Sequence, residues 1–462
     1  MPPSLNISTI TSNQVNLILN RDEGQFCDFK AKEIAPAKLS RTLSAFANAD
    51  GGEVFVGITD PKNAPAKWDG FEREEDVNAH LQVVDTLFPM GSVCRTELLI
   101  CADSKGLVLH IEIDKTSDIR NASDGVPYLR RGAQNLAQDN IDKIQRLKLD
   151  KGITSFEDQT VQSDINIITN SNPIIEFMID AVPSAEPEAW LRKQKLIVQN
   201  KPTVAGTLLF SEEPQSDIPK STIKIYRYRT TGIGTREILA FDPISVDGHI
   251  YFQIFSTVES IKKITEEIPL LGREGLEKIE YPTEAIHEIV TNAVIHRDYS
   301  INDDVHVRIF DNRIEVHSPG SLPGHVTVKN ILEERAARNP KTVRILNKFK
   351  NPPNKDVGEG LNTAFEAMRN LKLKDPVIEQ KENRVLVTLR HEKLGTPEQI
   401  IVEYLTTNQE INNATARSLC FIGSENTMKR IFQKMITSGL IERIPGRPLI
   451  RTGYVKGPNF PK

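Results

Sequence analysis

Cysteine is scarce in this sequence of 462 residues, which contains four cysteines and no pair at CxxC spacing. Structural zinc sites and disulfide frameworks both need closely spaced cysteines, so neither is indicated and the thiols are expected to be buried. Long apolar runs are also lacking, since none approaches the roughly 20 residues that span a bilayer. The first residues, MPPSLNISTITSNQ, have neither the basic nor the apolar region of a secretory signal. These absences predict a cytoplasmic protein with no membrane partner.

The excess of charge of one sign is small, with a formal net charge of −4. A uniformly acidic surface would repel nucleic acid, but the electrostatic footprint of nucleic-acid binding is local. Between Gly395 and Lys462 the sequence has nine lysines and arginines against five glutamates, whereas the rest of the chain is acidic overall. The C-terminal part is therefore the segment best suited to face an anion.

The length predicts several domains, because a single core rarely grows beyond about 250–300 residues. Apolar content of 39% and charged content of 26% are typical of globular proteins. Strand-like and helical runs alternate in a pattern that predicts a multidomain α+β protein. The expected regions are a first domain at 1–150, a connecting α+β region at 151–254, a third domain at 255–394 and a C-terminal module at 395–462.

Several segments of the first two regions have clear local patterns. The residues from Ala37 to Asn48 predict a helix, and the hydrophilic stretch from Thr154 to Asn172 is interpreted as a linker. The apolar runs TVAGTLLF, STIKIYRY and GHIYFQIF are separated by proline and glycine and predict strands.

Acidic side chains near the N-terminus are candidates for a metal site. If FCDFK is a strand, Asp28 and Lys30 share one face while Phe29 points into a core. Asp60 ends the run EVFVGIT just before a proline, where a side chain emerges at the edge of a sheet. Carboxylates gathered in this way would bind Mg²⁺ or Mn²⁺, and a neighbouring lysine suits activation of water against a phosphodiester. Surface acids are common, however, so spacing alone favours a structural role.

EGQFCDFK and SAFANADGGEVFVGITD resemble the E-x4-E-F-K and SAFANT-GG-x-L-x-IG-x-D motifs of the Schlafen/AlbA-type DNA-binding family. The resemblance covers most of residues 15–135 and implies an α/β domain. In nuclease members the motif residues form the metal and catalytic site, which here implies Glu23, Asp28, Lys30 and Asp60. Asp28 stands where the family usually has Glu. YLRRGAQN resembles the closing stretch of the family, in which Arg130 and Arg131 would contact phosphate or be solvated.

A helix is predicted from Pro282 to His296, and it carries a polar stripe on a mostly apolar surface. Glu284, Glu288, Asn292 and His296 follow one another at i, i+4 spacing. A solvated face would explain this stripe equally well. Two glycine-bearing segments downstream, SPGSLPG and GEGL, would let backbone approach a ligand and favour a binding site.

The segments EIVTNAVIHRDY, SPGSLP, ARNP and VGEGL together resemble the ATP-binding domain of the GHKL superfamily, in its helicase-related or transcriptional-regulator branch. The resemblance spans residues 255–393 and implies a Bergerat-type α/β sandwich. By this resemblance Glu288 orients the attacking water and Asn292 holds Mg²⁺. Residues implied to hold or cover the nucleotide are His296, Gly320, Arg338, Asn339, Gly358, Gly360 and Leu361.

Ser318 stands where typical GHKL enzymes have an aspartate that reads adenine. ATP binding is therefore better supported than rapid hydrolysis. The superfamily often dimerises on ATP, so the resemblance implies a homo-oligomer in which the nucleotide is a switch.

The C-terminal module predicts three short helices followed by two strands around Pro445-Gly446. This pattern is typical of a winged helix-turn-helix whose third helix enters a major groove. The residues then available to nucleic acid are Asn426, Lys429, Arg430 and Lys434 on the helix and Arg447 near the wing tip. A winged helix that binds protein is the alternative.

Two functions account for both ends of the chain. The first is an ATP-binding, nucleic-acid-binding protein, with DNA preferred to RNA, in which the nucleotide switches DNA engagement in transcriptional regulation or phage defence. The second is an ATP-gated, Mg²⁺- or Mn²⁺-dependent nuclease that cleaves RNA or DNA. An assembly factor whose winged helix binds protein is a third possibility.

Overall fold

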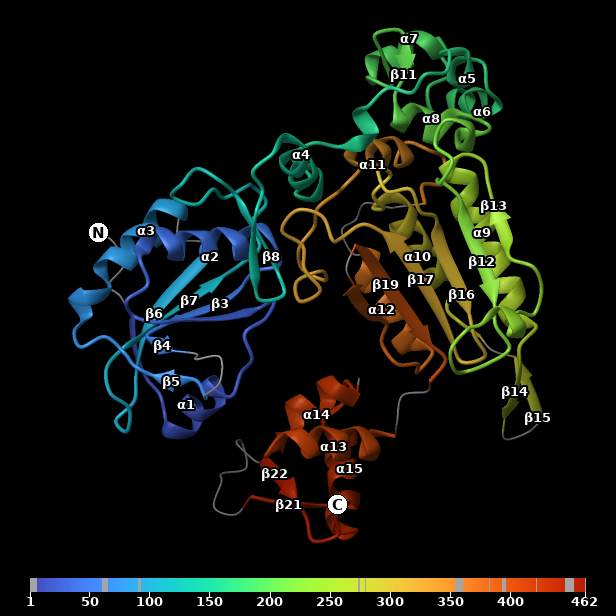
Figure 1. The fold of residues 1–462 in the computed structure, drawn as a ribbon. Helices are drawn as coiled ribbons and strands as arrows, with labels where there is room; N and C mark the ends of the chain where they lie inside the picture. Colours follow the sequence, from blue (N-terminus) through green and yellow to red (C-terminus); the bar gives the residue numbers. More distant parts are fainter. Residues whose placement is uncertain are drawn as a thin grey trace.

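The computed structural model describes residues 6–59, 65–89, 93–272, 275–278, 280–353, 360–381, 383–392, 396–420, 422–444 and 453–461, and at 269–272 and 275–278 it describes the backbone alone. Figure 1 shows an N-terminal α/β unit in blue and cyan, a green helical region, a central sheet in yellow and orange, and a red C-terminal unit. Among the helices of these described segments, none has the length and apolarity needed to cross a membrane.

The N-terminal unit is built on a five-stranded sheet with helices on both faces. The strand order is β1 (Asn6–Thr9), β6 (Cys94–Ile100), β7 (Val108–Ile113), β3 (Gly52–Val56) and β2 (Cys27–Lys30). Strand side chains alternate between faces, so Val54 and Val56 join the core under α2 (Pro36–Asn48) and α3 (Asn78–Leu87), while Phe55 joins the core under α1 (Ser12–Leu19). The predicted helix at Ala37–Asn48 is thereby confirmed.

Two small hairpins complete this unit. One pairs β4 (Ile58–Thr59) with β5 (Lys67–Trp68), and a 3-10 turn at Glu74–Val77 leads into α3. The other pairs β8 (Tyr128–Arg131) with β9 (Gln134–Ala137) and precedes α4 (Ile141–Asp150). The Asn48 side-chain amide donates to the Tyr128 carbonyl at 2.9 Å and so ties this hairpin to the end of α2.

The interpretation of Thr154–Asn172 as a linker is wrong, because the segment is folded and packed. It contains a 3-10 turn at Phe156–Asp158 and the short helix α5 (Asn166–Thr169). Glu157 is fully buried, and its carboxylate accepts the Lys341 and Thr342 amides at the start of α11 (Pro340–Leu346). An acid at a helix N-terminus satisfies amides that have no partner within the helix.

The green helical region continues with short elements. These are α6 (Asn172–Ala181), α7 (Pro187–Lys193), the hairpin of β10 (Ile197–Val198) and β11 (Lys201–Pro202), α8 (Val204–Phe210) and a 3-10 turn at Pro214–Ser216. TVAGTLLF was expected to be a strand, but it forms α8. An apolar run of this length does not distinguish a strand from a buried helix. Here every residue of α8 is buried, and the Thr203 hydroxyl accepts the Gly206 amide as N-cap.

A six-stranded sheet forms the central unit. Its order is β13 (Ile244–Val246), β12 (Ile223–Arg227), β16 (Val305–Ile309), β17 (Arg313–Pro319), β19 (Arg384–Arg390) and β18 (Val377–Lys381). The helices of the unit are α9 (Ile250–Glu266), α10 (Thr283–Ile295) and α12 (Gly360–Asn370). A 3-10 turn at Arg236–Ile238 and the hairpin of β14 (Pro269–Gly272) and β15 (Gly275–Lys278) lie in its connections.

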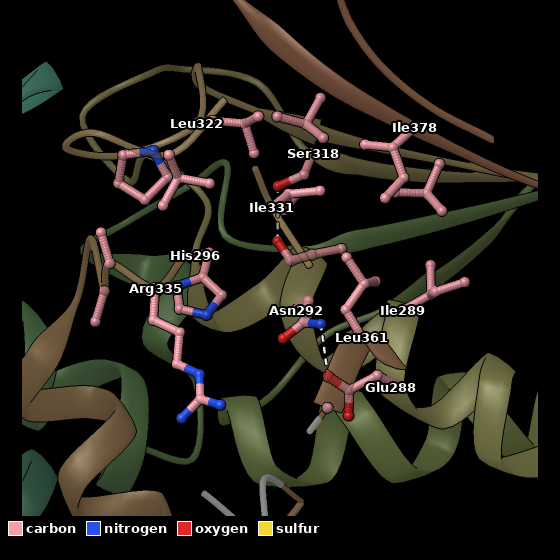
Figure 2. A pocket seen from close by; sticks show the side chains of 18 of the residues that line it. Glu288, Ile289, Asn292, His296, Ser318, Leu322, Ile331, Arg335, Leu361 and Ile378 are labelled. Atoms are coloured by element: carbon pink, nitrogen blue, oxygen red, sulfur yellow. Dashed lines mark hydrogen bonds between the residues drawn. The ribbon is translucent and has the colours of Figure 1, made fainter. Parts of the chain in front are cut away.

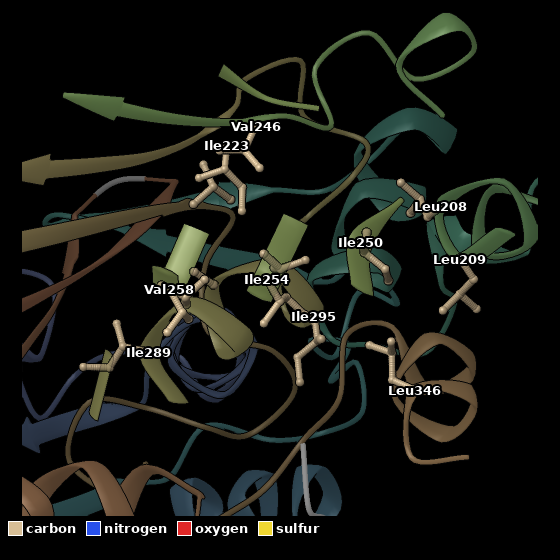
Figure 3. Close-up of a cluster of buried hydrophobic side chains, with 14 of the residues drawn as sticks. Leu208, Leu209, Ile223, Val246, Ile250, Ile254, Val258, Ile289, Ile295 and Leu346 are labelled. Carbon is tan, nitrogen blue, oxygen red and sulfur yellow. The ribbon is translucent and has the colours of Figure 1, made fainter. Parts of the chain in front are cut away.

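The core of the central unit joins the sheet to its helices. Figure 3 draws part of this core, in which Ile254 of α9 lies beside Ile295 of α10. STIKIYRY is confirmed as a strand by β12, but GHIYFQIF forms the start of α9, because its apolar residues bury one face of a helix. Since β12 and β13 belong to the central sheet, the expected boundary at residue 255 falls inside α9.

The C-terminal unit combines three helices with a three-stranded sheet. The elements are α13 (Pro397–Thr407), β20 (Ile411–Asn412), α14 (Asn413–Cys420), α15 (Glu425–Thr437), β21 (Ile441–Arg443) and β22 (Gly453–Lys456). The three predicted helices are confirmed. Ser424 caps α15 by accepting the Thr427 amide, and Met428, Phe432 and Met435 bury the inner face of that helix. Arg447, expected near a wing tip, lies outside the described residues.

His110 on β7 is held between two carboxylates. Its Nε2 lies 3.1 Å from Glu53 Oε2, and its Nδ1 lies 3.0 Å from Glu97 Oε1. Burial acts to lower the pKa of His110, but the hydrogen bonds to the two acids raise it above its usual value. Hydrogen bonds from His110 and from Arg21 lower the pKa of Glu53 to about 2.

This cluster predicts a pH-dependent stability. The raised pKa of His110 gives stabilisation that is complete below 6.5 and lost as the pH rises through the folded-state value. The lowered pKa of Glu53 gives stabilisation present above 4.5 and lost as the pH falls toward 2. His110→Gln should therefore lower the free energy of unfolding by about 1–2 kcal/mol at pH 5.5. The loss should be smaller at pH 9, and equal losses in chemical denaturation at the two pH values would contradict the assignment.

Candidate functional site

A cavity of about 330 Å³ lies between α10, the helix-facing side of the central sheet and the loop 320–337. Figure 2 shows the polar side chains of α10 at one end of the cavity and aliphatic side chains around the rest. The aliphatic wall comes from β17, β18, β19 and the loop, through Val316, Ile378, Val385, Val387, Leu322, Val326, Ile331 and Leu332. A concave, mostly apolar space with a few polar groups is the usual form of a small-molecule site.

Glu288 and Asn292 of α10 face the cavity together. The Asn292 side-chain amide donates to Glu288 Oε1 at 2.7 Å, which fixes both rotamers (Figure 2). Burial raises the pKa of Glu288, while the hydrogen bond from Asn292 lowers it. A carboxyl with a raised pKa suits the orientation of a water molecule. The Asn292 side-chain carbonyl oxygen is a ligand atom of the kind that Mg²⁺ binds. Glu284, one turn earlier, is exposed and does not line the cavity.

His296 and Ser318 also line the cavity. Burial lowers the pKa of His296 to about 4, so its ring is neutral at pH 7. The Ser318 hydroxyl donates to the Ala293 carbonyl at 2.8 Å, which attaches the end of β17 to α10. Ser318 stands at the position where an adenine-binding aspartate was expected, and it presents an uncharged hydroxyl that is hydrogen-bonded to α10.

Two glycines bring backbone close to the site. Gly320 has a φ of 105°, and a Cβ there would lie 2.8 Å from the Asp298 Cβ. A Cβ at Gly360 would lie 2.2 Å from Glu288 Oε1, so a larger residue at the start of α12 would require that carboxylate to move. Leu361 follows and lines the cavity. Gly358, also expected over the phosphates, lies outside the described residues.

Arg338 and Asn339, expected in a nucleotide lid, are buried and do not line the cavity. Arg338 donates to the Ser321 carbonyl at 2.8 Å and lies 3.4 Å from Asp298 Oδ2. The Asn339 amide donates to the carbonyls of Ile295 and Arg297, both at 2.9 Å. These side chains anchor the end of the cavity loop to the residues that follow α10.

Sequence reasoning missed the loop residues that close the cavity. Arg335 brings a guanidinium to the cavity from this loop (Figure 2). The loop has no regular secondary structure, so no periodicity indicated which of its side chains point inward. The available signal was the position of Arg335, three residues before the motif residue Arg338.

The N-terminal acids are engaged by cations of the same unit. Asp28 is 1% exposed, and its carboxylate lies 2.5 Å from Lys30 Nζ and 3.1 Å from Arg130 Nη2. Arg130 is 3% exposed, and its guanidinium also donates to the Gly24 carbonyl at 2.8 Å. Arg130 is therefore neither solvated nor open to phosphate, and it neutralises Asp28. Its neighbour Arg131 is exposed, and a contact with phosphate remains a prediction for it.

Glu23 lies at the edge of the same cluster. Its Oε1 accepts the Phe29 amide at 2.8 Å and lies 3.8 Å from Lys30 Nζ. Burial raises the pKa of Glu23. Asp60 lies outside the described residues, and within those residues no three His, Cys, Asp or Glu side chains are grouped to hold a metal.

The outer face of α15 carries the residues expected to contact nucleic acid. Asn426, Lys429, Arg430 and Lys434 are all exposed. Lys429 Nζ lies 2.6 Å from Glu425 Oε1, and Lys434 Nζ lies 3.0 Å from Glu398 Oε1. Exposed ion pairs of this kind are weak, so phosphate could displace either partner acid.

The buried pair of Asp28 and Arg130 predicts a large stability effect. Arg130→Met should lower the free energy of unfolding by about 3–5 kcal/mol, because it leaves a buried carboxylate with one counter-ion fewer. Arg131→Met changes the exposed neighbour in the same strand and should cost less than about 0.5 kcal/mol. Chemical denaturation of both variants measures the difference, and a small effect at both positions would contradict the buried pair.

Two family models match parts of the chain. Residues 23–139 match "Schlafen, AlbA_2", and residues 302–389 match "Putative ATP-dependent DNA helicase recG C-terminal". The first range contains Glu23, Asp28, Lys30 and both arginines of β8. The second contains β16, β17, β18, the cavity loop and all but the last residue of β19, and it begins after α10.

Among solved structures, the DIP2311 protein from Corynebacterium diphtheriae is similar to this chain over 96% of both chains, with 18% identity and a TM-score of 0.44. No curated protein matches the sequence significantly. The two family matches together indicate an ATP-binding protein associated with nucleic acid.

Proposed function

We propose that this protein binds ATP with Mg²⁺ in the cavity beside α10, and that nucleotide occupancy switches its engagement with DNA. The observation that carries the proposal is the Glu288–Asn292 pair, which faces a cavity of about 330 Å³ beside Gly360. The family match over residues 302–389 supports a nucleotide as the ligand.

The residues around the cavity fit a nucleotide. The volume of the cavity lies at the lower end of the roughly 300–1,000 Å³ usual for small-molecule sites, and the aliphatic wall of the cavity suits a nucleotide base. The Asn292 carbonyl oxygen would hold Mg²⁺, which would neutralise phosphate charge. The start of α12 would offer backbone amides to the phosphates, and Arg335 would add a positive charge.

Two finer assignments of fold belong to this proposal. The central unit is assigned a GHKL-type sandwich, supported by a sheet whose apolar face packs on α9, α10 and α12 beside the cavity. The C-terminal unit is assigned a winged helix, supported by three helices beside a small antiparallel sheet. Helix α15 of the C-terminal unit would enter a major groove of DNA. Arg131 of β8, in the N-terminal unit, would add a contact with a phosphate.

The contacts of the N-terminal acid Asp28 favour a nucleotide-dependent switch in DNA binding, and not cleavage of nucleic acid, as the function. The carboxylate of Asp28 is already neutralised by Lys30 and Arg130, both within 3.1 Å. Metal binding there would have to displace a buried arginine that also holds the Gly24 carbonyl. We therefore propose a DNA-binding regulator and not an ATP-gated nuclease.

ATP with Mg²⁺ should raise the melting temperature by about 5–10 °C at a hundredfold excess over Kd, because the ligand binds only the folded state. Asn292→Ala should abolish the Mg²⁺-dependent part of this shift by removing an oxygen ligand. Glu284→Ala, on the same helix but outside the cavity, should keep it. An unchanged melting curve at saturating ATP would refute the nucleotide site.

DNA binding should depend on the exposed face of α15. Reversing Lys429 and Arg430 to glutamate should weaken duplex DNA binding at least tenfold and reduce the salt slope by about 2, because each phosphate contact releases a counter-ion. Reversing Lys348 and Lys350, exposed in the central unit, makes the same change in net charge and should have little effect. Titrations at two salt concentrations measure both slopes. Equal losses in the two double variants would refute a specific role for α15.

A further inference from the structure

The loop that closes the cavity is held by a lysine of the N-terminal unit. Lys115 follows β7 and is 8% exposed. Its Nζ donates to the Leu322 carbonyl at 2.9 Å and to the Val326 carbonyl at 3.2 Å. Asp50 Oδ1 lies 3.7 Å from the same nitrogen. The ammonium group thus donates two hydrogen bonds, both to carbonyls of the loop, and has Asp50 as its ion-pair partner.

Both acceptors lie in the wall of the cavity. Leu322 and Val326 line it, and Gly324 between them has a φ of 60°. The Gly324 amide donates to the Asp150 carbonyl at the end of α4, at 3.3 Å. This tight turn is therefore fixed on both sides by groups from residues 115–150, and its position sets one side of the space open to a ligand.

Asp50 extends the connection into the N-terminal unit. Its Oδ1 accepts a hydrogen bond from the side-chain amide of Gln380 on β18 at 3.3 Å, and Gln380 Oε1 accepts one from the backbone amide of Leu322 at 2.8 Å. Its Oδ2 accepts from the Gln25 amide at 3.4 Å, and Gln25 Oε1 accepts the Gly132 amide at 2.8 Å. Hydrogen bonds therefore run from the cavity wall to the turn of the β8–β9 hairpin, which carries Arg130 and Arg131.

We propose that Lys115 is a positioning residue of the cavity, which fixes the wall at Leu322 and Val326 and couples occupancy of the cavity to the β8–β9 hairpin through Asp50. This inference rests on the proposed function, because it needs a ligand in the cavity. Beyond that function, the N-terminal unit supplies part of the cavity wall, and its β8–β9 hairpin responds to occupancy of the cavity.

Physical arguments support a coupling role. Burial lowers the pKa of Lys115 and Asp50 opposes this, so the buried ammonium depends on nearby acceptors for its stabilisation. A ligand that moves the Leu322 and Val326 carbonyls must change the free energy of that buried charge. Coupling is reciprocal, so a ligand on the hairpin would also change affinity at the cavity.

A second contact between the units offers a control. Arg146 of α4 lies 2.6 Å from Asp298 Oδ2 and 2.7 Å from Asp150 Oδ1, and it also donates to the Ser300 hydroxyl at 3.1 Å. None of these acceptors belongs to the cavity loop. Arg146→Met therefore weakens the junction without removing a donor from the wall.

The test uses the full chain with ATP and Mg²⁺, and compares Lys115→Met, Lys115→Arg and Arg146→Met with the wild type. ATP affinity is measured by calorimetry, and the hairpin response is the change in amide hydrogen exchange at residues 128–137 on adding ATP. Lys115→Met should weaken ATP binding about tenfold and abolish the hairpin response. Lys115→Arg should restore most of both, and Arg146→Met should keep both.

Unchanged ATP affinity and hairpin response in Lys115→Met would overturn the inference, as would equal losses in Arg146→Met. If Lys115→Met does not fold, Gln380→Leu removes the parallel bridge between Leu322 and Asp50 and should reduce the hairpin response. A full response in Gln380→Leu would then overturn the inference. Failure of the wild type to bind ATP would refute the proposed function as well, whereas ATP binding without a hairpin response refutes this inference alone.

Discussion

The burial of α10 is the constraint on which the candidate site depends. Ile286, Ile289, Val290 and Val294 pack in the central core, and each contributes about 1.5–3 kcal/mol by leaving water. This sum exceeds the cost of bringing Asn292 out of water, because its amide is hydrogen-bonded to Glu288. The apolar face therefore sets the rotation of the helix, which turns Glu288, Asn292 and His296 toward the cavity.

Glycine and serine let the rest of the site approach this helix. Gly360 brings α12 against the Glu288 carboxylate, and Gly320 lets the chain turn beside Asp298 at the end of β17. Ser318 closes the contact by donating to a carbonyl of α10. The cavity thus lies where the sheet, α10 and the loop meet.

Buried cations perform a different task, which is to join segments that are distant in sequence. Arg130 binds Asp28 across 102 positions, and Lys115 binds the Leu322 carbonyl across 207. Burying a charge is costly unless it is paired and hydrogen-bonded, so each contact holds only while its acceptors keep their places. The Lys115 contact thereby fixes how the N-terminal unit meets the cavity loop, whereas the Arg130 contact joins two segments within the N-terminal unit.

The sequence alone determined the features that depend on local pattern and spacing. These include the helices at α2, α10 and α15, the strand β12 and the i, i+4 placement of Glu288, Asn292 and His296, because helical and strand periodicities follow directly from the order of residues. Only the tertiary structure decided whether TVAGTLLF and GHIYFQIF are strands or helices, since a short apolar run fits either and the surrounding core selects one. It likewise decided that Arg130 neutralises Asp28 and that Lys115 reaches the cavity wall, because a contact between distant segments depends on how the whole chain packs.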